Sequence, residues 1–177
     1  MHFLPAWKRA LQQSGAKDWH FVVAGPDEGG HRVEVEALVS SLELGSSVSF
    51  VGLLQGEEKR AALGAASAFV LPSHSEGFSM SLLEAMGAHL PLLITPHCNF
   101  PEAVQVGAAL SIEATEESSV QGLDSLFSLS ALQLQTMGDC GRSLVEQDYT
   151  WESAAQKMES VYLWCCGQSS KPNCVIE

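Results

Sequence analysis

Residues 71–87 read LPSHSEGFSMSLLEAMG and pass from a buried strand through a polar loop into a helix. The apolar run over residues 68–72 predicts the strand, and the helix is expected over residues 79–88. Between them, Gly77 is expected to allow the backbone a sharp entry into the helix. A strand followed by a loop and a helix is the repeating unit of α/β proteins.

The same unit recurs along the chain. Further strands are expected at residues 20–25, 48–52, 91–95 and, more weakly, 108–112. Helices are expected at residues 2–10, 35–42, 57–66, 116–129, 131–147 and 151–165, the last with Thr150 as its N-cap. The first helix is only weakly amphipathic, through Leu4, Trp7 and Leu11, and is expected to dock loosely. Since the strands are apolar throughout and alternate with helices, we predict a doubly wound, Rossmann-like parallel sheet.

Length and charge narrow the possible functions. The 177 residues suffice for one domain, expected over residues 1–166, followed by a loose tail over residues 167–177. The net charge of −12 argues against nucleic acid as a partner. No apolar run approaches the about 18–20 residues needed to span a bilayer, and we expect no signal peptide. Five cysteines without a CxxC pair indicate reduced thiols and a cytoplasmic location.

The residues after the third expected strand suit a phosphorylated ligand. In parallel sheets, ligands bind where the strands end, which brings the loops at residues 25–30, 52–56, 72–77 and 96–102 to one edge. The first N–H groups of the helix after Glu76 carry its positive dipole end. Glu84 has apolar neighbours, so its carboxylate needs hydroxyl or N–H partners, and a ribose diol would supply them. The alternative is that Glu76 is an ordinary helix-cap acid and that Glu84 faces solvent.

The segment EGFSMSLLEAMG resembles the E-x7-E motif of retaining glycosyltransferases with the GT-B fold, family four, and specifically their C-terminal, nucleotide-sugar-binding domain. The fuller family pattern is about PS-x-x-EGFG-x-x-x-LEAM-x-x-G-x-P. This chain matches the pattern, with the same spacing, at residues 72–73, 76–78, 83–86 and 91. Residues 21–25 and 48–52 resemble the two preceding strands of the family, and the likeness spans about residues 20–164.

The resemblance implies retaining transfer of a sugar from a UDP-, GDP- or ADP-sugar, without a metal or other cofactor. The catalytic residue would be Glu76, close to the donor sugar, while Glu84 would bind the ribose. Backbone N–H groups of Gly77, Phe78, Ser79, Met80 and Ser81 would meet the sugar and the phosphates. The base would contact Leu54, and Gly25 would shape the nearby loop. For Lys59, a place near the diphosphate and a solvated position on the helix face are both open.

Two departures from the family pattern matter. The family usually has glycine where this chain has Ser79, which narrows the expected sugar pocket. Family members also begin this domain with a strand and an Arg/Lys loop that holds the diphosphate. We expect residues 2–10 to be the helix that follows that loop, and we expect the loop and the acceptor-binding domain to be absent from this chain. We therefore expect an incomplete donor-binding domain that is inactive alone and binds donors no tighter than about millimolar. The missing strand should leave a gap beside residues 20–25, and we expect self-association there, with a solvated monomer as the alternative.

The alternative function is a non-catalytic nucleotide-sugar-binding or assembly module that kept the fold. A dehydrogenase fits poorly, because no G-x-G-x-x-G follows the first expected strand.

Overall fold

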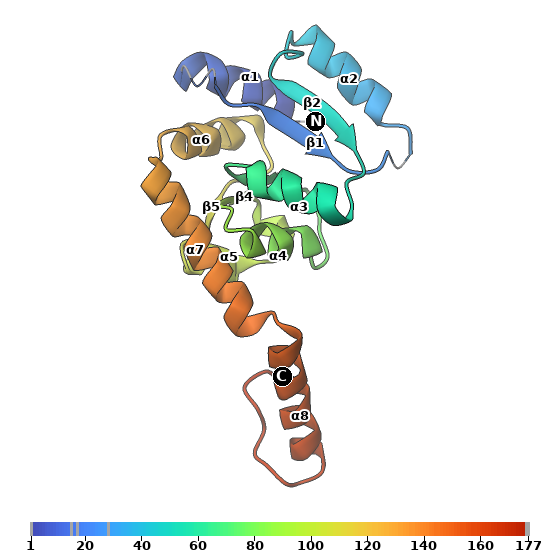
Figure 1. Ribbon diagram of the computed structural model, residues 1–177, viewed down its shortest axis with the longest axis vertical. Coiled ribbons are helices and arrows are strands. Elements are labelled where there is room, and N and C mark those ends of the chain that lie inside the picture. The colour runs from blue at the N-terminus through green and yellow to red at the C-terminus, as the bar shows by residue number, and fades with distance from the viewer. Residues whose placement is uncertain (1, 15, 17, 28, 176–177) are drawn as a thin grey trace.

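The structure is a computed structural model that describes residues 2–14, 16, 18–27 and 29–175. Met1, Glu28 of the predicted 25–30 loop and the last two residues of the predicted tail lie outside these ranges. The helices are α1 (Phe3–Ser14), α2 (Arg32–Ser41), α3 (Gly56–Ala65), α4 (Met80–Gly87), α5 (Pro101–Gln105), α6 (Glu116–Phe127), α7 (Ala131–Asp148) and α8 (Trp151–Cys165) (Figure 1). The strands are β1 (Phe21–Ala24), β2 (Val48–Gly52), β3 (Phe69–Leu71), β4 (Leu92–Ile94) and β5 (Ala109–Ser111).

Every predicted strand is present, with each end within one residue of its expected position. Thr150 caps α8 as predicted, because its side chain accepts a hydrogen bond from the Ser153 N–H. The prediction of a plain loop at residues 96–102 was wrong. That segment holds the 3-10 turn η1 (Pro96–Cys98) and the start of α5, and a proline occupies the first turn of each. Proline suits this position because the first turn of a helix needs no N–H from it.

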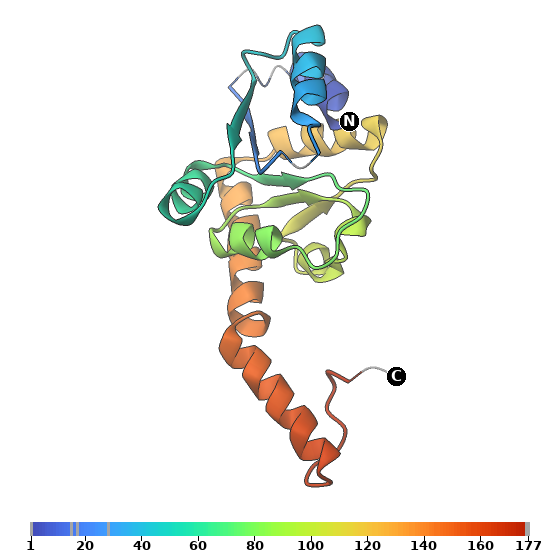
Figure 2. The same cartoon turned by 90° about the vertical axis from the view of Figure 1, so that its right-hand side faces the viewer.

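All strand pairs are parallel, which confirms the predicted α/β class. The strands nevertheless form two sheets, β1-β2 and β3-β4-β5, where the sequence predicted a single one. Within the described residues, no ladder joins β1 to β3, so each of these strands keeps one edge without a strand partner. Figure 2 shows the two sheets as separate groups of strands.

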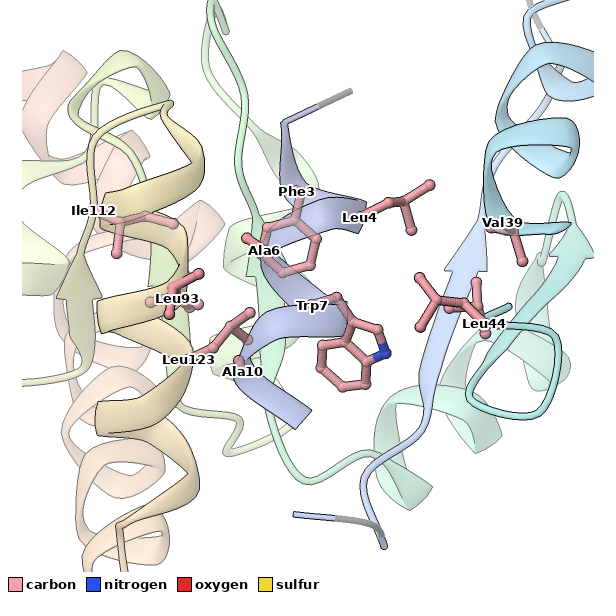
Figure 3. Packing of buried hydrophobic residues seen from close by; sticks show 12 residues of the cluster. Phe3, Leu4, Ala6, Trp7, Ala10, Val39, Leu44, Leu93, Ile112 and Leu123 are labelled. Carbon is pink, nitrogen blue, oxygen red and sulfur yellow. The ribbon is translucent and has the colours of Figure 1, made fainter. Parts of the chain in front are cut away.

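Helix α1 connects the two sheets through a shared apolar core. Figure 3 shows it between Leu93, Ile112 and Leu123 on one side and Val39 and Leu44 on the other. Five residues of α1 are buried: Phe3, Leu4, Ala6, Trp7 and Ala10. The expectation of loose docking was therefore wrong. The buried residues recur at i, i+1, i+3, i+4 and i+7, which is one broad apolar face of a helix. The prediction underestimated this face because it counted only Leu4, Trp7 and Leu11.

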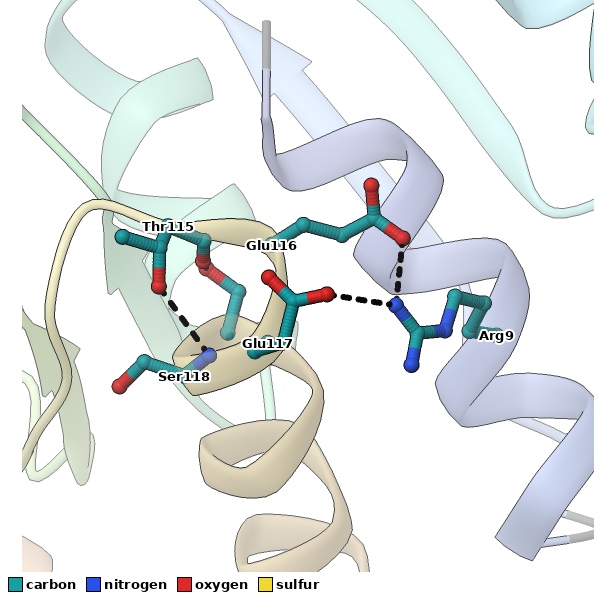
Figure 4. Close-up of polar contacts among 6 residues, drawn as sticks. Arg9, Thr115, Glu116, Glu117 and Ser118 are labelled. Atoms are coloured by element: carbon teal, nitrogen blue, oxygen red, sulfur yellow. Dashed lines mark hydrogen bonds and ion pairs between the residues drawn. The ribbon is translucent and has the colours of Figure 1, made fainter.

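Polar contacts add to the α1–α6 packing at the start of α6 (Figure 4). Nη1 of Arg9 lies 2.6 Å from Oε1 of Glu116 and 3.4 Å from Oε1 of Glu117. The two carboxylates raise the pKa of the Arg9 guanidinium, mainly through these hydrogen bonds. Thr115 caps the same helix by accepting a hydrogen bond from the Ser118 N–H at 3.3 Å. Exposed ion pairs contribute little to stability, so the contacts chiefly set how α1 lies against α6.

A second core joins α4, β4, α5, β5 and α7, and Gly138 controls how closely α7 approaches it. A Cβ on Gly138 would lie 1.9 Å from the backbone oxygen of His89, at the turn between α4 and β4. Gly64, within α3, is a matched glycine because a Cβ there would meet no described atom within 4 Å.

We expect Gly138→Ala to lower the free energy of unfolding by about 1–3 kcal/mol, because α7 must move away from a rigid backbone group. Gly64→Ala should instead raise it by up to about 1 kcal/mol, since alanine favours the helix. Urea unfolding of both variants measures the two changes. Equal stability of Gly138→Ala and the wild type would contradict the close packing of α7.

Helix α8 projects from the body, and residues 167–175 return beside it without helix or strand (Figure 1, Figure 2). It has no fully buried residue, and Trp151 at its start is 93% exposed. Among the residues that the structure describes, no helix combines the length and the apolar composition needed to cross a bilayer.

Candidate functional site

Glu76 lies in the loop after β3, at the carboxyl end of the strand, as predicted. Its side chain is held by Ser73, whose hydroxyl donates to Oε1 of Glu76 at 2.8 Å. Its backbone is held on both sides: the Glu76 N–H donates to the His97 oxygen at 3.0 Å, and the Glu76 oxygen accepts from Nδ2 of Asn99 at 2.7 Å. A half-buried carboxylate with these contacts has a defined direction rather than a solvated range of positions.

The loop after β4 supplies most of the support for the loop that carries Glu76. Thr95 is buried, and its hydroxyl donates to the Ser73 oxygen at 2.6 Å. Cys98 is also buried, and its thiol donates to the Leu71 oxygen at 3.4 Å. Because β3 and β4 are adjacent and parallel, their following loops leave the sheet at the same edge and can hydrogen bond along their length.

Sequence reasoning missed the roles of Ser73, Thr95 and Asn99 in this network. The available signal was Asn99 in the Asn-Phe-Pro segment, because asparagine tolerates the left-handed backbone that such turns need. In the structure, Asn99 has φ 52° and ψ 38°.

Helix α4 begins at Met80, directly after the Glu76 loop, with Ser79 as its N-cap residue. The N–H groups at the start of a helix have no carbonyl partner four residues earlier, and here Leu82 is held by the Ser79 oxygen at 3.2 Å. The Phe78 and Met80 side chains are 57% and 61% exposed, so this turn faces outward. The start of α4 is thus open to a ligand from solvent.

The conformational role expected for Gly77 was wrong. Its φ lies outside the left-handed region, and a Cβ there would meet no described atom within 4 Å. The chain turns into α4 through Ser79 instead, which is extended at φ −83° and ψ 105°.

Glu84 and Lys59 meet across the space between α4 and α3. Nζ of Lys59 lies 2.5 Å from Oε1 of Glu84, and the side chains are 41% and 38% exposed. These two residues are 25 positions apart in the chain. Each predicted binding residue therefore has the other as its polar partner in this structure, and both remain accessible from solvent.

Gly25 and Leu54 lie in the connections that follow β1 and β2. The Gly25 N–H donates to the Gly52 oxygen at 2.9 Å, which ties the two strand ends together. Leu54 is half-buried in the connection from β2 to α3. A cavity of about 500 Å³ opens here, lined among others by Gly25, Asp27, Arg32 and Phe50. Leu54, Lys59, Glu76 and Glu84 do not line it, so Gly25 is the predicted site residue that this cavity contains.

An aromatic cluster adjoins the Glu76 loop. The ring of Phe78 is stacked on that of Tyr149 at 6.0 Å between centroids, and Phe100 meets both rings edge-on. Burial raises the pKa of the Tyr149 hydroxyl, with Glu102 and Asp148 adding to the effect. Tyr149 ends α7, so this stack connects the Glu76 loop to the junction of α7 and α8.

Comparison with known proteins identifies relatives of the chain. A family model described as Glycosyl transferases group 1 matches residues 2–144. One relative, a subunit of the human phosphatidylinositol N-acetylglucosaminyltransferase, is 27% identical over 146 residues, which are 82% of this chain and 30% of the relative. The MMP alpha-(1->4)-mannosyltransferase of Mycolicibacterium hassiacum is 30% identical over 130 residues, which are 72% of this chain and 31% of the relative. The chain therefore spans about a third of the length of these relatives.

Solved structures share the fold. The C-terminal domain of the group 1 family glycosyl transferase LpcC from Francisella tularensis superposes with a TM-score of 0.69 at 25% identity, over 85% of this chain and 78% of that domain. The pneumococcal O-GlcNAc transferase GtfA, solved with UDP and GlcNAc, superposes with a TM-score of 0.71 at 16% identity, over 91% of this chain and 32% of that chain.

Proposed function

Since this chain belongs to the Glycosyl transferases group 1 family, we propose that it binds the nucleotide-sugar donor of a sugar transfer that retains the configuration at the anomeric carbon. The observation that supports this most directly is the pair of Lys59 and Glu84, about 40% exposed, on adjacent helices. A nucleoside diphosphate presents a diol and a diphosphate, so it offers a new partner to the carboxylate and to the ammonium group.

In this proposal, the carboxylate of Glu84 accepts hydrogen bonds from the two ribose hydroxyls, and Lys59 turns from Glu84 toward the diphosphate. The first-turn N–H groups of α4, over residues 78–81, add hydrogen bonds and the positive end of the helix dipole. Leu54 contacts the base, and Gly25 shapes the loop beside it.

Glu76 lies close to the donor sugar in the same proposal. Its carboxylate already accepts a hydrogen bond from Ser73, and its backbone is held by the loop after β4. Because this carboxylate is already held, it loses little further conformational entropy when the donor binds and it can orient the sugar hydroxyls.

The relatives support a hexosyl donor. The human relative is named as part of an N-acetylglucosaminyltransferase and the mycobacterial relative as a mannosyltransferase. The structure of GtfA contains UDP. We propose a UDP-, GDP- or ADP-sugar as the ligand and leave acceptor binding to the parts of such enzymes that lie outside the matched region. The chain has five cysteines and no CxxC pair, and on this ground we propose a reducing compartment, the cytoplasm.

Titration of the chain with UDP-, GDP- and ADP-sugars, followed by NMR, tests donor binding. We expect one nucleotide series to shift the amides of residues 78–81 together with those of Lys59 and Glu84. The amides of α6, which faces α1, serve as the internal control and should not move. No selective shift with any donor at up to about 10 mM would contradict the proposed function. A dissociation constant above that concentration leaves too little binding free energy for the specific hydrogen bonds that the proposal assigns.

A further inference from the structure

Asn99 has an unusual backbone for a residue with a side chain. Its φ of 52° and ψ of 38° place it in the left-handed region, where glycine is favoured and asparagine is tolerated. Asn99 is also exposed, so burial does not explain its identity. What its side chain does is donate from Nδ2 to the backbone oxygen of Glu76 at 2.7 Å, across 23 residues of sequence.

This hydrogen bond completes a clamp on one peptide segment. The N–H of Glu76 donates to the His97 oxygen, two residues before Asn99, so residues 97–99 hold Glu76 from both its N–H and its C=O. The Ser73 hydroxyl then directs the carboxylate, and the Ser73 oxygen is itself held by Thr95. The position and direction of the Glu76 side chain thus depend on the loop after β4.

We propose that Asn99 is a positioning residue that fixes the Glu76 carboxylate for contact with the sugar part of the donor. The inference rests on the proposed function for the identity of the ligand, but the clamp itself exists without ligand. Asn99 acts on the sugar alone, because Glu76 is assigned to the sugar and Glu84 with Lys59 to the nucleotide. Its loss should therefore change the preference for a sugar nucleotide over the corresponding nucleoside diphosphate.

Two substitutions separate the side chain from the backbone. Asn99→Gly removes the donor and relaxes the left-handed backbone, so the turn itself should persist. Asn99→Asp keeps the shape and tolerates the same backbone, but it places a carboxylate against the Glu76 oxygen. Asn173→Gly, in the exposed segment after α8, is the matched control.

In the ligand-free protein, we expect Asn99→Gly to speed hydrogen exchange at the Glu76 amide about fivefold, the factor that corresponds to one ordinary hydrogen bond. The preference for the sugar nucleotide over its nucleoside diphosphate, from NMR titrations with both, should fall about fivefold as well. The affinity for the nucleoside diphosphate should stay unchanged. Asn99→Asp should show losses at least as large, and Asn173→Gly should show none.

The outcomes decide between a positioning role and a merely structural one. Equal weakening of both ligands in Asn99→Gly, wild-type preference in Asn99→Asp, or unchanged exchange at the Glu76 amide would each overturn the assignment. If the wild type binds none of these nucleotides, the proposed function fails and the sugar role of Asn99 fails with it. Faster exchange at Glu76 in Asn99→Gly would then support the clamp alone.

Discussion

Replacing Trp7 by alanine is expected to lower the free energy of unfolding by about 3–5 kcal/mol, the range measured when a buried tryptophan is truncated. The Trp7 side chain is only 2% exposed and lies where α1 meets both sheets (Figure 3). Its ring contacts Phe21 at 5.5 Å and Phe127 at 5.6 Å between centroids, and its indole N–H donates to the Ser47 hydroxyl at 3.3 Å. The substitution leaves a cavity in the core that β1 and α6 share.

Trp151→Ala is the matched control. Trp151 is 93% exposed at the start of α8, so its removal should change the free energy of unfolding by no more than about 0.5 kcal/mol. Urea unfolding followed by circular dichroism compares the two variants with the wild type. A small effect of Trp7→Ala, similar to that of Trp151→Ala, would show that α1 is not part of the common core.

The second large effect is expected at Glu84. Hydrogen bonds to a charged group contribute about 1.5–3 kcal/mol each, so losing two from the ribose should weaken nucleotide binding about 100-fold or more. Glu84→Ala should therefore abolish the amide shifts that a nucleotide causes at residues 78–81 under conditions where the wild type shows them. The variant should still fold, because the Lys59–Glu84 pair is partly exposed and such pairs stabilise little.

Glu146→Ala is a suitable control for this variant. Glu146 forms a comparable exposed ion pair with Arg142 on α7, at 2.7 Å. The Glu146→Ala variant should bind the nucleotide as the wild type does. If Glu84→Ala also bound like the wild type, the Lys59–Glu84 pair would be a surface ion pair without a role in the ligand site.

Local patterns predicted the secondary structure well, and the reason is physical. Strands of a parallel sheet are covered on both faces, so they are continuous apolar runs such as residues 91–95, bounded by polar turns. Helix α8 was predicted to the residue because its apolar period and its Thr150 cap are both local signals. The short helices η1 and α5 were missed because three to five residues are too few to show a helical apolar period, although Pro96 and Pro101 each stand in a first helical turn.

Contacts between distant segments were harder to predict. The apolar face of α1 can be read from the sequence, but nothing near Trp7 indicates that α6 and β1 will both pack against that face. The division into two sheets depends likewise on which strand edges meet, and hydrogen-bonded pairing across a sheet leaves no trace in the composition of one strand.

The resemblance of residues 72–91 to a known motif indicated the family, which the family model then showed. The sequence by itself determined the α/β class, the order of the strands and the loop that carries Glu76. These follow from residue type and spacing within one segment, because local periodicity decides which face of an element is apolar. Only the tertiary structure decided that Lys59 faces Glu84, that Asn99 holds the Glu76 peptide and that α1 joins the two sheets. Each of these contacts brings together residues more than 20 positions apart, and their distances depend on how whole elements pack rather than on any pattern along the chain.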